Sequence, residues 1–176
     1  PPISPPTPIT QTIALTNPNL VILEPDGTIR ELVSESVLHP SWSLDGKWIA
    51  YSSAQEGSLD LYRIPVSGGV VERLTDLPSR ETHPTWLPDD NHLIYASDIY
   101  GVSKLYLLDL FSKKNEPLRG LPFPASWPAV SPDGNRLAFS VVPGGKGELN
   151  VVDLDSDFQP IMATLTSLGI SSGSDI

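Results

Sequence analysis

The sequence predicts an all-β fold, namely a β-propeller segment of about four blades in which the first blade is incomplete. A motif recurs in which a proline, a large apolar residue, an aspartate turn and a β-rich segment follow one another. Its turn aspartates are Asp45, Asp89 and Asp133, so both steps of the repeat are 44 residues long. A repeat of this length with four short strands is typical of a four-stranded antiparallel propeller blade. The 19 prolines interrupt most windows in which a long helix could form.

Each repeat predicts four strands in a fixed order. Residues 39–53 predict the first hairpin, because the β-formers of 48–51 follow a turn in which aspartate bonds the nearby backbone and glycine tolerates positive φ. The third strand, 59–64, alternates apolar with polar residues, and 70–75 forms the fourth. The equivalent segments of the next copies are 83–97, 104–110 and 116–119, then 127–140, 149–154 and 160–165.

Both ends of the chain depart from the repeat. Residues 1–11 are proline-rich and predict an extended linker. Residues 12–33 match a shortened repeat without its innermost strand, so we expect the propeller to occupy 12–170. The tail, 171–176, leads toward a next strand that is missing. We expect a segment of a larger ring. The alternative is a closed ring of four blades in which the tail or the proline segment supplies the missing inner strand.

Composition excludes several classes of function. The net charge is −10, and a nucleic-acid partner would require a clustered basic face, so none is expected. No apolar run approaches the roughly 18 residues of a membrane span, so direct membrane insertion is not expected either. The absence of cysteine excludes disulfides and thiolate zinc sites, and no cofactor is expected.

The repeat resembles a known family. Residues 40–53, followed by Leu-Tyr-Arg-Ile at 61–64 and Arg-Leu-Thr at 73–75, are similar to the TolB-like (WD-like) β-propeller repeat, and 131–140 is equally close. Asp90 in place of the turn glycine and Val130 in place of the tryptophan depart from the pattern. The resemblance implies a periplasmic or extracellular setting in bacteria and a scaffold for proteins or peptides. It also implies an alternative, because such propellers occur as gating or substrate-binding domains of prolyl-oligopeptidase-type serine peptidases and sugar lyases.

Three large side chains share one repeat position, directly before the innermost strand. These residues are His39, His83 and Trp127, and the loops that lead into inner strands lie at one mouth of the central channel. The simpler interpretation is structural, with a hydrogen bond to the neighbouring blade. The functional interpretation is contact with a protein or peptide partner. A metal site is disfavoured, because two histidines without a third ligand at matching spacing make a poor site.

The predicted function is that of a non-catalytic interaction scaffold. Exposed loops beside the mouth are expected at 54–58, 77–82 and 120–126, with Arg80, Glu81 and Phe123 as further candidates for partner contact. His92 follows a turn and is expected to be exposed. Unpaired blade edges also predict possible self-association.

Three other patterns have simple explanations. Residues 169–173 match G-x-S-x-G, but a nucleophile elbow needs a following helix and a later histidine, so this segment is interpreted as a loop. The Asp-Gly turns could suggest calcium, yet one carboxylate per blade does not converge on an ion. Trp42, Trp48 and Trp86 fall on apolar strand positions and are predicted to pack between sheets.

Overall fold

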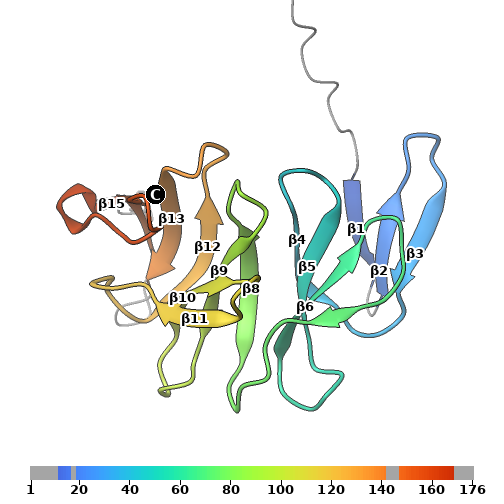
Figure 1. Cartoon of the computed structure of the whole chain (residues 1–176), viewed down its shortest axis with the longest axis horizontal. Coiled ribbons are helices and arrows are strands. Elements are labelled where there is room, and N and C mark those ends of the chain that lie inside the picture. The colour runs from blue at the N-terminus through green and yellow to red at the C-terminus, as the bar shows by residue number, and fades with distance from the viewer. Residues whose placement is uncertain (1–11, 17–18, 142–146, 169–176) are drawn as a thin grey trace, which may run out of the picture. The chain divides into compact units, whose positions relative to one another are not determined.

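The computed structural model of this chain describes residues 12–16, 19–141 and 147–168. The chain forms two compact units, 1–37 and 38–176, which are described separately. Every sheet is antiparallel, and each joins strands that are consecutive in the chain (Figure 1). Within the described residues, no helix has the length and apolar character that crossing a membrane requires. The predicted all-β class is confirmed.

The first unit contains the incomplete first blade. Its strands β1 (Thr12–Thr16), β2 (Asn19–Leu23) and β3 (Ile29–Val33) form one three-stranded sheet in this order. The amide of Thr28 donates to Asp26 Oδ1 over 2.9 Å, so the aspartate closes the turn between β2 and β3. The three strands of this sheet confirm that the first blade is incomplete.

The second unit contains three four-stranded blades. The second blade consists of β4 (Leu38–Trp42), β5 (Trp48–Ser53), β6 (Asp60–Pro65) and β7 (Glu72–Arg73). The third consists of β8 (Glu81–Trp86), β9 (His92–Ser97), β10 (Lys104–Asp109) and β11 (Lys114–Pro117). The fourth consists of β12 (Ala125–Val130), β13 (Arg136–Val141), β14 (Glu148–Asp153) and β15 (Thr166–Leu168).

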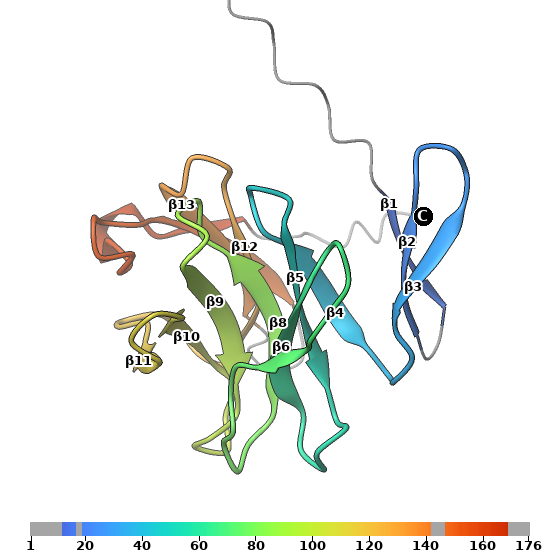
Figure 2. The same ribbon diagram turned by 45° about the vertical axis from the view of Figure 1, so that its right-hand side comes forward.

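The three blades of this unit pack face to face. Figure 1 shows the third blade between the second and the fourth, and Figure 2 shows the same blades turned by 45°. The inner strands are in contact, β4 with β8 and β8 with β12. Leu93 and Tyr95 of β9 pack toward the second blade, whereas Ile94 and Ala96 pack toward the fourth. Successive residues of a strand point to opposite faces, so both faces of the third blade are buried. The predicted sheet-to-sheet position of Trp86 is confirmed, since this side chain is 6% exposed in the same apolar cluster as Leu93.

The repeated turns are held by their own side chains. Asp45 Oδ1 accepts from the amide of Lys47 over 2.9 Å, and Asp133 Oδ1 accepts from the amide of Asn135 over 3.1 Å. Ser43 and Ser131 donate to these aspartates and accept from the first amide of the following strand. The hydrogen bonds that these aspartates accept from the turn backbone therefore explain why aspartate occurs in the turns.

Asp90 shows why one turn departs from the repeat. Its φ of 53° is the left-handed value that the turn glycine adopts in the other copies. Its Oδ1 accepts from the amide of Leu44 over 2.7 Å, and its Oδ2 accepts from the amide of Asp45 over 3.2 Å. At this position aspartate adopts the backbone conformation that glycine adopts more easily, and its side chain forms hydrogen bonds to the turn of the preceding blade.

Three details of the prediction are corrected. The outermost strand of the fourth blade is β15 rather than 160–165, because the chain first forms a turn closed by the bridge between Leu154 and Pro160 and then a 3-10 helix, Met162–Thr164. Strand β7 has two residues rather than the predicted six. His92 is only 21% exposed, and its ring lies 5.2 Å from the ring of Phe158. The linker 1–11, the tail 171–176 and the G-x-S-x-G segment 169–173 lie outside the described residues.

Gly134 is expected to be essential to the contact between neighbouring turns. It adopts φ +74°, and an added Cβ would lie 2.8 Å from Pro88 Cγ in the turn of the third blade. Gly134→Ala should therefore lower the free energy of unfolding by about 2–4 kcal/mol, from backbone strain and overpacking together. Gly101 is the matched control, since it has φ +76° and no neighbouring atom within 4 Å of such a Cβ. Urea unfolding of both variants measures the difference, and equal losses would contradict a steric role for Pro88.

Candidate partner-binding site

Each inner strand of the second unit carries the same irregularity. The pairing register shifts between Leu38 and Ser41 in β4, and it shifts at the equivalent places in β8 and β12. A residue with positive φ followed by proline occupies each bulge, and these residues are His39, His83 and Trp127, with φ of 52°, 55° and 57°. Left-handed backbone costs a non-glycine residue about 1–2 kcal/mol. A bulge turns a side chain away from the direction that the strand would otherwise give it.

The three bulges bring their side chains together, as the shared repeat position predicted. The ring centroids of His39 and His83 are 3.6 Å apart, and those of His83 and Trp127 are 3.9 Å apart. The three rings thus form a stack of inclined rings across the inner strands, with interplanar angles of 33° and 48°. A cavity of about 400 Å³ is lined by the residues of the three bulges: His39, Pro40, Ser41, His83, Pro84, Thr85, Trp127, Pro128 and Ala129.

The two imidazoles are neutral at pH 7. Burial lowers the pKa of His39, and burial together with the neighbouring His39 lowers the pKa of His83 to about 4. Both ring nitrogens of His83 and Nδ1 of His39 are buried without a hydrogen-bond partner among the described residues. The predicted hydrogen bond from His83 to a neighbouring blade is therefore wrong, because the ring stacks instead. A ligand could bond these nitrogens only if the neighbouring rings moved apart, because the nitrogens are buried in this arrangement.

The stack is poorly arranged for a metal ion. Within the described part of the chain, no group of three or more histidine, aspartate or glutamate side chains could hold one. The rings of His39 and His83 are inclined to each other by 33°. Because imidazole lone pairs lie in the ring plane, two nearly stacked rings do not direct them at a common point.

Two of the three loop candidates have the expected exposure. Phe123 is 61% exposed, and the Lys104 Nζ lies 5.1 Å from its ring centroid. Arg80 is exposed, and its amide donates to Asp98 Oδ1 over 2.8 Å. Trp127 is 61% exposed as well.

Glu81 is the exception, since it is not on an exposed loop. It begins strand β8 and is fully buried. Its Oε1 accepts from Ser79 Oγ over 2.5 Å and from Ser97 Oγ over 3.0 Å, whereas Oε2 has no partner among the described residues. Burial raises the pKa of Glu81, and the nearby Asp60 raises it further. This carboxyl therefore cannot be a direct contact for a partner at the surface.

The repeat itself contained the signal for this burial. Residues 44 positions before and after Glu81 are Val37 and Ala125, both apolar. Ala125 begins β12 and is 1% exposed. Alignment of the repeats therefore predicts a buried position at 81, whereas a search for charged residues near a loop selects Glu81 for its residue type alone.

These features define the class of protein. Blades of four antiparallel strands, a 44-residue repeat and inner strands that meet side by side are the features of a β-propeller. Residues 12–120 match the family model described as the TolB beta propeller domain. This match covers more than half of the chain, so the chain belongs to the TolB β-propeller domain family.

Individual relatives agree with this family. The Tol-Pal system protein TolB of Francisella tularensis subsp. tularensis is 36% identical over 61 residues, which is 32% of this chain and 14% of that protein. The chain thus corresponds to a small part of the length of that relative. The crystal structure of TolB from Acinetobacter baumannii superposes with a TM-score of 0.74 at 21% identity, covering 90% of this chain and 40% of that one.

The same fold occurs in an enzyme. An acylaminoacyl peptidase in complex with a chloromethyl ketone has a TM-score of 0.58 at 14% identity, covering 86% of this chain and 28% of the peptidase. At such identities the likeness shows the fold alone.

Acidification should destabilise the protein through His83. The pKa of His83 is about 4 in the folded state and 6.5 in its ordinary state, so the unfolded chain binds more protons between these values. The stability contributed by neutral His83 is present above pH 6.5 and is lost as the pH falls toward 4. His83→Asn, which tolerates the left-handed backbone, should reduce this loss. Urea midpoints across this pH range test it, and an unchanged slope in the variant would contradict the assignment.

Glu81 should have the opposite pH dependence. Because burial raises its pKa above the ordinary value of 4.5, the folded state favours the protonated form. The stability associated with that proton is present below pH 4.5 and is lost as the pH rises through the raised pKa. Glu81→Gln should therefore stabilise the protein at neutral pH relative to the wild type. The exposed Glu56→Gln is the control, and thermal unfolding at pH 4 and pH 8 would refute the idea if both variants behaved alike.

Proposed function

We propose that this chain is a non-catalytic scaffold that binds a protein or peptide at the channel mouth, defined by His39, His83 and Trp127. The observation that carries the proposal is the repeated left-handed bulge. Each of the three costs backbone strain, and all three direct a large ring into one cavity. Strained residues that converge on a cavity are typical of a functional site.

The chemistry of the mouth suits a peptide. If the rings part to admit a ligand, the unpartnered imidazole nitrogens can bond the N–H or C=O groups of a peptide backbone, and each neutral ring offers both a donor and an acceptor. The exposed indole of Trp127 supplies an amphipathic surface that is enriched at protein interfaces. Phe123 and Arg80, on the loops leading into β12 and β8, are further candidates for contact.

The relatives support a proposal for the cellular setting. The Francisella protein is named as part of the Tol-Pal system, so we propose that this chain acts in the bacterial cell envelope, in the periplasm or outside the cell. Self-association through blade edges would rest on few backbone groups. The outer strands β7 and β15 have only two and three residues, so they offer few unpaired backbone groups to a second copy.

A role within a larger enzyme is the second candidate. The structural similarity to the acylaminoacyl peptidase favours it, since the same propeller fold is part of that peptidase chain. In this case the chain would gate or bind a substrate, and the reacting groups would belong to another domain. A catalytic domain in the same open reading frame would support this alternative.

The proposal is tested by peptide selection. A random peptide library is panned on the immobilised chain, and the affinity of the enriched peptides is measured for the wild type, Trp127→Asn and His83→Asn. Loss of the indole should weaken binding by about tenfold or more, since tryptophans are frequent hot spots. The control is Phe111→Ala, because Phe111 is 90% exposed and lies at the end of β10 opposite to the start of β8. Binding lost in Phe111→Ala but kept in Trp127→Asn would overturn the assignment.

A further inference from the structure

The periphery between the second and third blades is filled by an arginine. Arg63 of β6 places its Cζ 4.3 Å from the centroid of the Trp48 ring, and its guanidinium lies 2.7 Å from Glu72 Oε2. Lys113, from the turn between β10 and β11, reaches the other oxygen of Glu72 over 2.7 Å. One guanidinium is thus held between an aromatic face and a carboxylate, and a cation from the next blade completes the arrangement.

The next pair of blades repeats this arrangement without its cations. The positions 44 residues further along are Leu107 for Arg63, Glu116 for Glu72, His92 for Trp48 and Asp157 for Lys113. The strand register is the same, since Arg63 pairs with Glu72 across β6 and β7, and Leu107 pairs with Glu116 across β10 and β11. The second arrangement therefore has a carboxylate and an aromatic ring at the same positions. It has leucine in place of the arginine and aspartate in place of the lysine.

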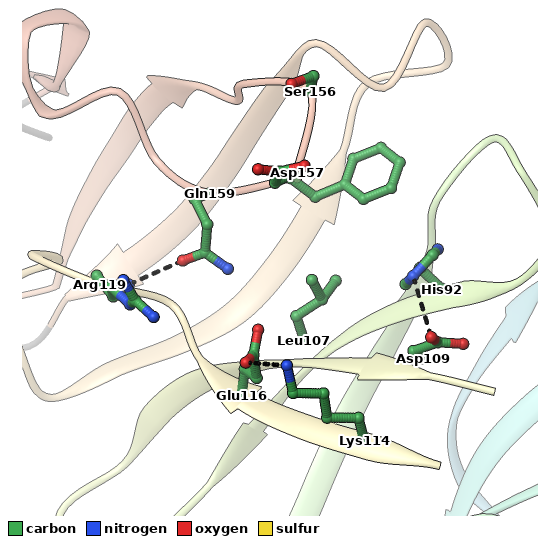
Figure 3. Close-up of a pocket in the computed structure, with 10 residues that line it drawn as sticks. His92, Leu107, Asp109, Lys114, Glu116, Arg119, Ser156, Asp157 and Gln159 are labelled. Carbon is green, nitrogen blue, oxygen red and sulfur yellow. Dashed lines mark hydrogen bonds and ion pairs between the residues drawn. The ribbon is translucent and has the colours of Figure 1, made fainter. Parts of the chain in front are cut away.

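A cavity of about 400 Å³ lies at this second place, which we call the outer cavity. Figure 3 shows Leu107 in its middle, with His92 and Asp109 on one side and Gln159 and Arg119 on the other. Its lining residues are His92, Leu107, Asp109, Lys114, Glu116, Arg119, Ser156, Asp157, Phe158 and Gln159.

Aromatic and acidic groups surround the outer cavity together. The rings of His92 and Phe158 are 5.2 Å apart, so flat surfaces from the third and fourth blades line one part of it. Asp109, Glu116 and Asp157 contribute three carboxylates. A guanidinium prefers this combination, because its N–H groups bond carboxylates in the plane while its faces stack on rings.

We infer that the outer cavity binds a guanidinium group, in the form of an arginine side chain presented by a ligand. The ligand would supply from outside the group that Arg63 supplies within the chain at the preceding blade pair. This site lies on the outer strands β10 and β11 and on the turn 155–159, away from the channel mouth, and does not depend on the function proposed for that mouth.

Two cations that line the outer cavity, Lys114 and Arg119, affect how tightly a guanidinium would bind. Lys114 Nζ lies 2.6 Å from Glu116 Oε1, so an incoming guanidinium must displace it. The Lys114 side chain is 65% exposed, and an exposed ion pair contributes little to stability, so the displacement costs little. The three carboxylates against Lys114 and Arg119 leave one excess negative charge in the lining.

The inference is tested by NMR titration of the intact chain with Nα-acetyl-arginine methylamide. Nα-acetyl-citrulline methylamide is the matched control, because it has nearly the same shape without the charge. We expect the arginine probe to shift the amide signals of Leu107, Glu116 and Phe158 at concentrations where the citrulline probe does not. Equal shifts with both probes, or none with either, would overturn the inference.

Three variants sharpen the test. Leu107→Arg should fill the outer cavity from within and abolish binding of the probe, whereas Leu107→Met, which conserves volume, should retain it. Glu116→Gln should weaken binding about tenfold, and Lys114→Met should strengthen it severalfold. Trp127→Asn should leave the titration unchanged, which separates this site from the channel mouth. Probe binding that survives Leu107→Arg unchanged would place the site elsewhere and refute the proposal.

Discussion

Burial of two apolar faces per sheet is the constraint on which the blades of the second unit depend. In β9, Leu93 and Tyr95 pack toward the second blade while Ile94 and Ala96 pack toward the fourth. A single four-stranded sheet cannot cover both of these faces, so each blade is stable only beside its neighbours. Hydrogen bonds between turns, such as those from Leu44 and Asp45 to Asp90, join neighbouring blades in addition to this packing.

The bulges of the inner strands show how the same scaffold obtains a site. In a regular strand, alternate residues point into the two packing faces, and no side chain points along the sheet edge. The left-handed residue before each proline breaks this alternation and directs His39, His83 and Trp127 to a common place. The regular packing of the sheets therefore holds the strands in place, and the three bulges place the rings that line the cavity. Their rings stay close because the inner strands that carry them are in contact.

Differences between equivalent positions distinguish one blade pair from the next. Arg63 and Leu107 occupy one position of the repeat, as do Glu81 and Ala125, and each substitution changes charge or volume where the backbone stays the same. Equivalent positions of the repeat can therefore be compared directly, because the backbone pairing is the same and only the side chain differs. An arginine fills one blade periphery, and its replacement by leucine leaves a cavity at the next. A buried carboxyl at position 81 likewise has an alanine as its counterpart.

The sequence alone determined the all-β class, the 44-residue repeat, the order of strands and the equivalence of His39, His83 and Trp127, because each of these is a matter of periodicity along the chain. It could not determine the boundaries of the outer strands, since the turn at Leu154 and Pro160 depends on pairing across the fold. Nor could it show that the His83 ring packs against its neighbours without a hydrogen bond, whereas the apolar residues at the equivalent positions 37 and 125 did indicate that Glu81 is buried. Burial and stacking belong to the packed sheets, and only the tertiary structure decides which neighbours a side chain meets.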